Sequence, residues 1–153
     1  MKWLMLFCLT LLFFGCEEDG FRGLEVRDDS SVTLLNGTWK VIAYEDFEQS
    51  KLITKTEENS WGKDVIIAFD DTTDTRSISG QNTTNSVGCT FEYTEQRSIQ
   101  TSSLFSTYVN QPEWGNRFGR VISESDLQFT INTTRLKVYN ESEQLSARFE
   151  KEW

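Results

Sequence analysis

Short stretches of alternating hydrophobic and polar residues dominate the chain from residue 38 onward. The first, 38–44, places Trp39, Val41 and Ala43 on one face, and a period of two is typical of a half-buried β-strand. Short polar turns separate it from seven further stretches: 65–69, 75–79, 87–93, 97–101, 127–132, 135–139 and 145–150. The pattern predicts a mainly β fold, a single antiparallel meander of about eight strands closed or nearly closed into a β-barrel.

One segment, 110–122, has the period of a helix instead. Asn110 is a candidate N-cap, Pro112 fits the first turn, and Glu113 stands three positions after the cap, as in a capping box. Four apolar side chains recur on one face of this short amphipathic helix: Trp114, Phe118, Val121 and Ile122. We expect this face to pack against the barrel as a plug or lid, the alternative being an exposed partner-binding face.

The first sixteen residues follow neither pattern. Lys2 precedes an apolar run over 3–14, and Gly15 and Cys16 follow it, before three acids at 17–19. A membrane-spanning helix needs roughly 20 apolar residues, whereas the core of a signal peptide has about 7–15. Gly-Cys after such a run resembles the lipobox of bacterial lipoproteins, in the looser form of Bacteroidetes-type signals. An ordinary signal peptide cut nearby is the alternative.

The resemblance implies that Cys16 is lipidated and becomes the first mature residue. The chain is then divided into a signal peptide (1–15), a flexible tether (16–31) and a β-barrel domain (32–153). Acyl chains would hold the protein on the bacterial outer membrane. Acids directly after the cysteine resemble a surface-export tag, so we expect display at the cell surface, or otherwise attachment at the periplasmic face.

Composition and charge exclude several functions. The net charge is −9, and loss of Lys2 with the leader leaves 14 basic and 24 acidic side chains, a net charge of −10. This balance opposes nucleic-acid binding but leaves a basic protein as a possible partner. The chain has no histidine, which excludes histidine-dependent nucleophile systems and metal sites. No spacing selects a pair of carboxylates, so we expect a non-enzyme without cofactor or metal, the alternative being a carboxylate-based hydrolase.

The chain has three cysteines, which are expected to have different fates. Cys8 leaves with the leader and Cys16 is used by the lipid, so Cys89 has no partner for an intramolecular disulfide. Cys89 alternates with the hydrophobic residues of 87–93. It is therefore predicted to be a buried small hydrophobe rather than a reactive thiol.

Two family resemblances involve the barrel. Gly37-Thr38-Trp39 resembles the Gly-x-Trp start of lipocalin-like domains. In that family an arginine of the last strand lies over the tryptophan, which implies a cation–π contact between Arg148 and Trp39.

The order of features over 36–151 is also similar to the META domain of heat-shock-inducible bacterial lipoproteins. Besides the tryptophan-bearing first strand, the residues that fit its pattern are Ala68-Phe69, Gly80, Asn85, Phe91, Tyr93, Thr107, Trp114, Phe118, 136–139 and Phe149. The family's Gly-Cys-Asn reads Thr83-Thr84-Asn85 here, so the paired cysteines of many members are missing. Both families form lipocalin-type barrels, and neither has a single assigned biochemistry.

The resemblances imply different binding sites. A lipocalin-like barrel would hold a small apolar ligand in a cavity lined by Trp39, Val41, Ile67, Phe69, Phe91, Tyr93 and Phe129. A META-like barrel would be filled, with its function on loops and surface.

Two long connections are candidate surface sites. The first, 45–64, contains a short predicted strand at 51–54 and Trp61, which is either an exposed binding anchor or, as we favour, folded over the barrel end. The second, 80–88, is a polar loop that could hydrogen-bond a sugar or a peptide, or be a simple turn. A third cluster, Asp70, Asp71 and Asp74, lacks the spacing of a calcium loop and is expected to be a solvated hairpin turn.

The sequence therefore predicts a lipid-anchored envelope lipoprotein that acts as a binding or interaction module. One alternative is a carrier of a small apolar ligand. Another is an inhibitor of a basic envelope-attacking enzyme such as lysozyme, although no inhibitor motif is evident.

Overall fold

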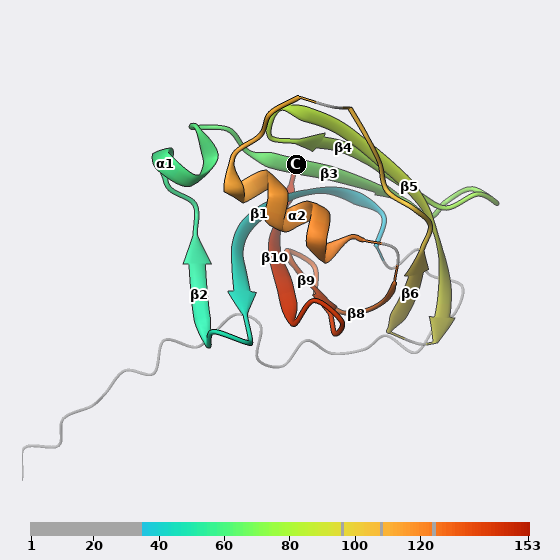
Figure 1. Cartoon of the computed structure of the whole chain (residues 1–153). Coiled ribbons are helices and arrows are strands. Elements are labelled where there is room, and N and C mark those ends of the chain that lie inside the picture. Colours follow the sequence, from blue (N-terminus) through green and yellow to red (C-terminus); the bar gives the residue numbers. More distant parts are fainter. Residues whose placement is uncertain (1–34, 96, 108, 124) are drawn as a thin grey trace, which may run out of the picture.

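The described part of the chain, residues 35–153 apart from 96, 108 and 124, closes eight antiparallel strands into a barrel (Figure 1). In this computed structural model each barrel strand pairs with its neighbours in chain order, and the last pairs with the first. The barrel strands are β1 (Gly37–Asp46), β3 (Val65–Asp70), β4 (Ser77–Asn82), β5 (Asn85–Glu95), β6 (Ser98–Thr101), β8 (Asp126–Ile131), β9 (Arg135–Asn140) and β10 (Leu145–Glu152). The predicted meander barrel is confirmed.

The predictions for the leader, for lipidation of Cys16 and for the tether 16–31 concern residues outside the described range. Of the helices within that range, none is long and apolar enough to cross a bilayer.

Strand β1 contains a β-bulge that changes which side chains point inward. Its register with β10 shifts between Val41 and Ala43, and an extra residue in one strand bends that strand and increases its twist. After the bulge, Tyr44 is completely buried. The first part of β1 pairs with β3 and the last part with β2 (Lys51–Thr54), so the bend allows one strand to serve both neighbours.

The polar segment 80–88 does not form the expected loop. Strands β4 and β5 continue through it as a hairpin in which Asn82 pairs with Asn85, and Thr83 adopts a positive φ of 56° in the turn. Gly80 lies within β4 at φ 154°, and a Cβ there would be 2.3 Å from the backbone oxygen of Ile66. A glycine at this position therefore permits close approach of β4 to β3.

Three short elements accompany the barrel. The strand predicted at 51–54 is confirmed as β2, which ends the strand order beyond β1. Helix α1 (Glu57–Ser60) and strand β7 (Phe105–Ser106), which pairs with β5, were not expected. Both are too short to produce a recognisable period in the sequence.

The amphipathic helix is confirmed as α2 (Glu113–Val121), but its predicted start is wrong. Pro112 occupies the N-cap position with extended backbone, and its side chain makes no cap hydrogen bond. Asn110 lies before the helix, where its carbonyl oxygen accepts a hydrogen bond from Thr84 Oγ1. Pairing of this segment with the β4–β5 turn keeps Asn110 out of the cap.

The apolar face of α2 is buried, as expected for a lid. Its four apolar side chains are all 0% exposed: Trp114, Phe118, Val121 and Ile122. Figure 1 looks onto this end of the barrel, with α2 across the opening. The helix is in contact with β3, β4, β9 and β10. We call this the α2 end.

At the opposite end, which we call the Leu35 end, the chain enters the barrel. Leu35 is 0% exposed, its amide donates to Asp71 Oδ2 (3.2 Å), and its carbonyl oxygen accepts from Trp39 Nε1 (2.9 Å). The hydroxyl of Tyr93, near the end of β5, also donates to Asp71 Oδ2 (2.8 Å). The first described residue is therefore fixed by contacts with β1, β5 and the turn after β3.

Candidate binding groove

A segment of the chain lies along β5 on its way to α2. Ser106 pairs with Val87 and Phe105 with Gly88, and the amide of Thr107 donates to the carbonyl oxygen of Ser86 (3.0 Å). These bonds extend the sheet outside the barrel for a few residues and bring 104–111 beside the helix.

The side chain of Asn85, the first residue of β5, holds the end of this segment. Its Nδ2 donates to Val109 O (2.9 Å) and Gln111 Oε1 (2.8 Å), and its Oδ1 accepts from Val109 N (2.8 Å) and Thr107 Oγ1 (3.1 Å). A carboxamide has two N–H donors and two acceptor lone pairs, and all four are engaged. Asn85 is 3% exposed, so it acts as a buried clamp.

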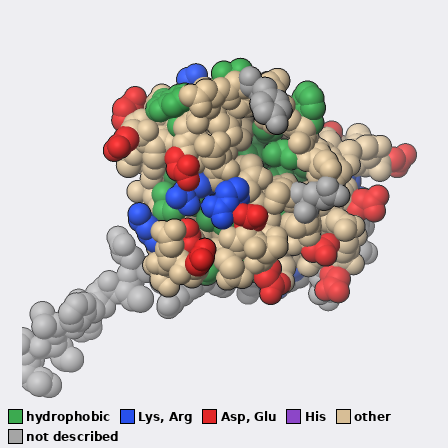
Figure 2. Space-filling model, viewed as in Figure 1, with side chains coloured by type: hydrophobic (Ala, Val, Ile, Leu, Met, Phe, Trp, Pro, Cys, Tyr) green, Lys and Arg blue, Asp and Glu red, His purple; other side chains and the backbone are tan. Residues whose placement is uncertain are grey.

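Between the clamped segment and α2 is an open groove of about 680 Å³. Three of its lining side chains are apolar: Leu104, Phe105 and Val109. The other lining residues carry carboxamides or hydroxyls: Asn85, Ser106, Thr107, Asn110, Gln111 and Asn116. Figure 2 views the α2 side of the molecule, and hydrophobic side chains are visible in a hollow next to the helix.

Several groups in the groove are available to a ligand. Phe105 is 69% exposed and Val109 58% exposed, and both line the same groove, as adjacent exposed apolar side chains do in binding sites. Gln111 Nε2 donates to Asn116 Oδ1 (2.8 Å). This bond orients both amides and leaves the Nδ2 group of the exposed Asn116 facing solvent.

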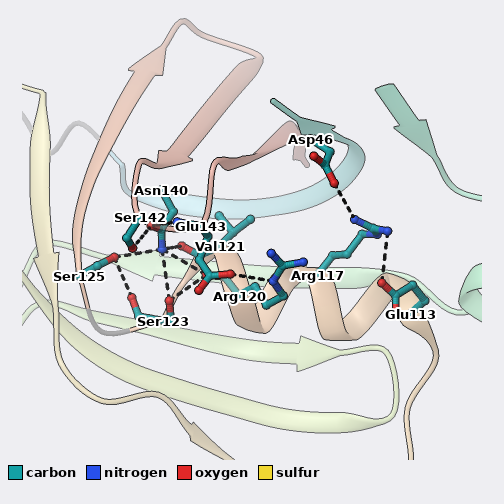
Figure 3. A network of polar contacts seen from close by, with 10 residues as sticks. All are labelled: Asp46, Glu113, Arg117, Arg120, Val121, Ser123, Ser125, Asn140, Ser142 and Glu143. Carbon is teal, nitrogen blue, oxygen red and sulfur yellow. Dashed lines mark hydrogen bonds and ion pairs between the residues drawn. The ribbon is translucent and has the colours of Figure 1, made fainter. Parts of the chain in front are cut away.

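The C-terminal half of α2 is held by a polar network (Figure 3). Asn140 of β9, 0% exposed, donates from Nδ2 to Val121 O (3.2 Å) and Ser125 Oγ (3.0 Å), among other acceptors, and accepts at Oδ1 from Ser142 Oγ (2.7 Å). Arg120 Nε donates to Glu143 Oε2 (2.7 Å). The C-terminal end of α2, the helix that carries Asn116 into the groove, is therefore anchored to the barrel.

A second pair of contacts holds the first turn of the helix. Arg117 lies between the carboxylates of Asp46 (3.7 Å) and Glu113 (3.3 Å), as Figure 3 also shows. Sequence reasoning did not single out Asn140 or Arg117. A lone polar residue at the end of a strand and an i,i+4 pair are too common to indicate such a role.

The residues predicted to line a ligand cavity lie together inside the barrel. Six are buried and belong to one apolar cluster: Trp39, Val41, Ile67, Phe69, Phe91 and Phe129. Tyr93 is half-buried against them. Ring centroids are 6.0 Å apart for Phe69 and Phe91, 5.6 Å for Phe91 and Tyr93, and 6.1 Å for Tyr93 and Phe129. These side chains contact one another, as edge-to-face aromatic packing favours.

The cation over Trp39 is not the one that the lipocalin resemblance implied. Lys151 Nζ lies 5.4 Å from the centroid of the Trp39 ring, and β1–β10 pairing places these two residues opposite each other. Arg148 instead binds the carboxylate of Glu45, which Lys137 and Ser146 also contact. Burial of Glu45 opposes ionisation, but the bonds from Lys137 and Arg148 outweigh it and lower the pKa of Glu45.

The three aspartates after β3 point to different partners. Asp70 accepts bonds from the hydroxyl (2.6 Å) and amide (3.1 Å) of Thr72, and these bonds lower the pKa of Asp70. Asp71 is 7% exposed and binds Leu35 and Tyr93, whereas Asp74 is exposed. Asp71 is thus part of the Leu35 end, contrary to the expectation of a wholly solvated turn.

Trp61 and Cys89 differ from their expected burial. Trp61 is 48% exposed at the left-handed C-cap of α1, so its ring is not covered by the barrel end as favoured. Cys89 is a free thiol, half-buried rather than buried, on the inward side of β5. Burial raises the pKa of Cys89 to about 11, which is consistent with a structural residue rather than a reactive thiol.

No protein-family model matches this sequence, and neither does any curated protein. Solved structures do match this chain. The NMR structure of a protein from Burkholderia xenovorans has a TM-score of 0.59 at 11% identity, covering 84% of this chain and 98% of that one. The crystal structure of a DUF4847-family protein from Bacteroides vulgatus has a TM-score of 0.49 at 14% identity, covering 77% and 94%. At these identities the first likeness concerns the fold alone.

Proposed function

We propose that this chain is a lipid-anchored lipoprotein of the bacterial envelope whose barrel acts as a binding or interaction module. The observation that carries the anchor is Gly15-Cys16 directly after the apolar run of 3–14. The binding role is supported by the groove beside α2, in which the exposed side chains of Phe105 and Val109 lie together.

The point at which the chain enters the barrel is consistent with a lipid anchor at one end and a binding groove at the other. Leu35, where the chain enters, is at one end of β5, and the Asn85 clamp is at the other. Eleven residues at about 3.3 Å each separate these ends by roughly 35 Å along the strand. In a barrel held by lipid at Cys16, the α2 end and its groove would therefore lie at the end opposite the point where the tether joins the barrel.

Three residues of the META pattern support a proposed relationship with META-type and lipocalin-like barrels. Gly80 permits close approach of two strands, and Asn85 and Thr107 hydrogen-bond each other to hold the segment before α2. Each therefore has a structural role in this barrel.

A second candidate function, inhibition of a basic envelope-attacking enzyme, has the net charge of −9 in its favour, since opposite charge speeds encounter. Titration of lysozyme with the purified protein tests it, and unchanged lysozyme activity would reject it. A carrier of a small apolar ligand has less support, because the interior aromatic rings contact one another.

Metabolic labelling with a fatty-acid analogue tests the anchor. We expect the wild-type protein and Cys89→Ser to incorporate the label and Cys16→Ser to lose it. A Cys16→Ser variant that retains the label would show that this cysteine is not the anchor. Proteolysis of intact cells tests the membrane face: cleavage before permeabilisation is expected, and cleavage only afterwards would indicate the periplasmic face.

A further inference from the structure

We propose that the groove beside α2 binds a neutral oligosaccharide. The inference rests on the proposed binding role of the barrel and adds the class of ligand. The groove differs in charge from the rest of the molecule. A quarter of all residues are charged, yet the described residues that line the groove are all uncharged.

This uncharged lining argues against ionic ligands. A charged group loses hydration when it enters a groove, and the loss is compensated only if an opposite charge or strong hydrogen bonds replace the water. Here the polar groups available are carboxamides and hydroxyls, which pair best with neutral hydrogen-bonding groups. The nearest described charges on α2, Glu113 and Arg117, are already paired with each other.

The distribution of side chains matches the two-sided chemistry of a sugar ring. A pyranose has C–H groups on its face and hydroxyls around its rim. Phe105, 69% exposed, offers an aromatic surface for the C–H face. The side-chain amides of Asn110 and Asn116 each offer donors and an acceptor oxygen to the groove, which suits neighbouring hydroxyls that each donate and accept.

The groove is also formed before a ligand arrives. The clamp by Asn85 fixes the segment that carries Val109 and Gln111, and the Gln111–Asn116 bond ties that segment to α2. A rigid site loses less conformational entropy on binding. The open groove of about 680 Å³ lies within the size range of small-molecule sites.

Wholly apolar ligands and peptides fit less well. An apolar ligand would cover the amides of Asn110 and Asn116 without hydrogen bonds, which costs free energy for each polar group buried. A neutral peptide is the nearest competitor, and it is distinguished by experiment.

Isothermal titration of the full-length protein in detergent micelles tests the proposal. The probes are maltotetraose, cellotetraose and mannotetraose, with tetragalacturonate as the anionic comparison and a neutral tetrapeptide as the peptide comparison. We expect at least one neutral tetrasaccharide to bind, and both comparison ligands to bind more weakly or not at all.

Variants link binding to the groove. Phe105→Ala and Asn116→Ala, both at exposed positions, are each expected to weaken binding about tenfold or more. Phe47→Ala is the matched control. Phe47 is 43% exposed and directly follows β1, and it does not line the groove.

Three outcomes would overturn the proposal: no neutral tetrasaccharide binds, binding is equal in Phe105→Ala and wild type, or the tetrapeptide binds more tightly than every saccharide. The fatty-acid label on Cys16 is measured independently of these titrations. Absence of saccharide binding would therefore not contradict the proposed lipid-anchored module, and absence of the fatty-acid label would not contradict the proposed saccharide groove.

Discussion

The hydroxyl of Tyr44 donates a hydrogen bond to the backbone oxygen of Trp114, 70 positions later in the chain, at 2.8 Å. The two rings also pack edge to face, with centroids 4.6 Å apart, and both side chains are fully buried. Burial raises the pKa of Tyr44 well above its ordinary value, so the hydroxyl remains protonated and able to donate. This contact joins the first barrel strand to the helix that covers the barrel.

Removing only this hydroxyl is expected to cost stability. Tyr44→Phe should lower the free energy of unfolding by about 1 kcal/mol, because the ring packing remains while one buried hydrogen bond is lost. Urea denaturation measures the change. Tyr139→Phe is the matched control, since the half-exposed Tyr139 hydroxyl accepts only a 3.2 Å bond from exposed Gln144 among the described residues. Equal effects of the two substitutions would contradict a specific role for Tyr44.

The clamp at Asn85 leads to a prediction about local opening. Asn85→Ala should release Thr107, Val109 and Gln111, because their bonds to the Asn85 side chain are lost, at a cost of about 0.5–1.5 kcal/mol for each hydrogen bond. Hydrogen exchange at the Val109 amide should accelerate strongly. Asn110→Ala removes an exposed amide and should leave exchange unchanged. Slow exchange at Val109 in Asn85→Ala would mean that the segment is held by other contacts.

Two glycine substitutions should change the stability of the fold in opposite directions. Gly80→Ala forces a Cβ to 2.3 Å from the Ile66 oxygen at a φ of 154°, so we expect a loss of several kcal/mol or failure to fold. Gly119→Ala, within α2, meets no atom within 4 Å and should raise stability by about 0.5–1 kcal/mol through helix propensity. Thermal unfolding of both variants tests the pair. A neutral Gly80→Ala would show that β3 and β4 can separate without cost.

The Glu45 cluster predicts how stability depends on pH. The pKa of Glu45 is lowered in the folded state from its ordinary 4.5, so this group stabilises the fold above about pH 4.5. That stabilisation is lost as the pH falls through the folded-state pKa. Glu45→Gln should therefore reduce the difference in urea midpoint between pH 7 and pH 3.

The control for this prediction is Glu141→Gln, at an exposed carboxylate in the turn after β9. It should retain the acid dependence of the wild type. If Glu45→Gln also retains it, the contacts with Lys137 and Arg148 do not contribute to acid stability.

Periodicity in the sequence determined most of the architecture. Alternation over 38–44 and its seven counterparts predicted the barrel strands, and the apolar face from Trp114 to Ile122 predicted a buried helix. These inferences hold because side-chain direction repeats every two residues in a strand and every 3.6 in a helix. Burial of the predicted interior residues follows from the same rule. Cys16 and the leader also stand out from the sequence alone, as a prediction about location.

Tertiary structure decided the details that form the groove. The bulge after Val41 turns Tyr44 toward α2, and no local pattern signals it. Register between β1 and β10 places Lys151, rather than Arg148, over Trp39. Asn85 meets Thr107 and Val109 only after strand pairing brings together positions 22 and 24 residues apart. Contacts at such separations depend on the register of the whole barrel, which neighbouring residues in the sequence cannot specify.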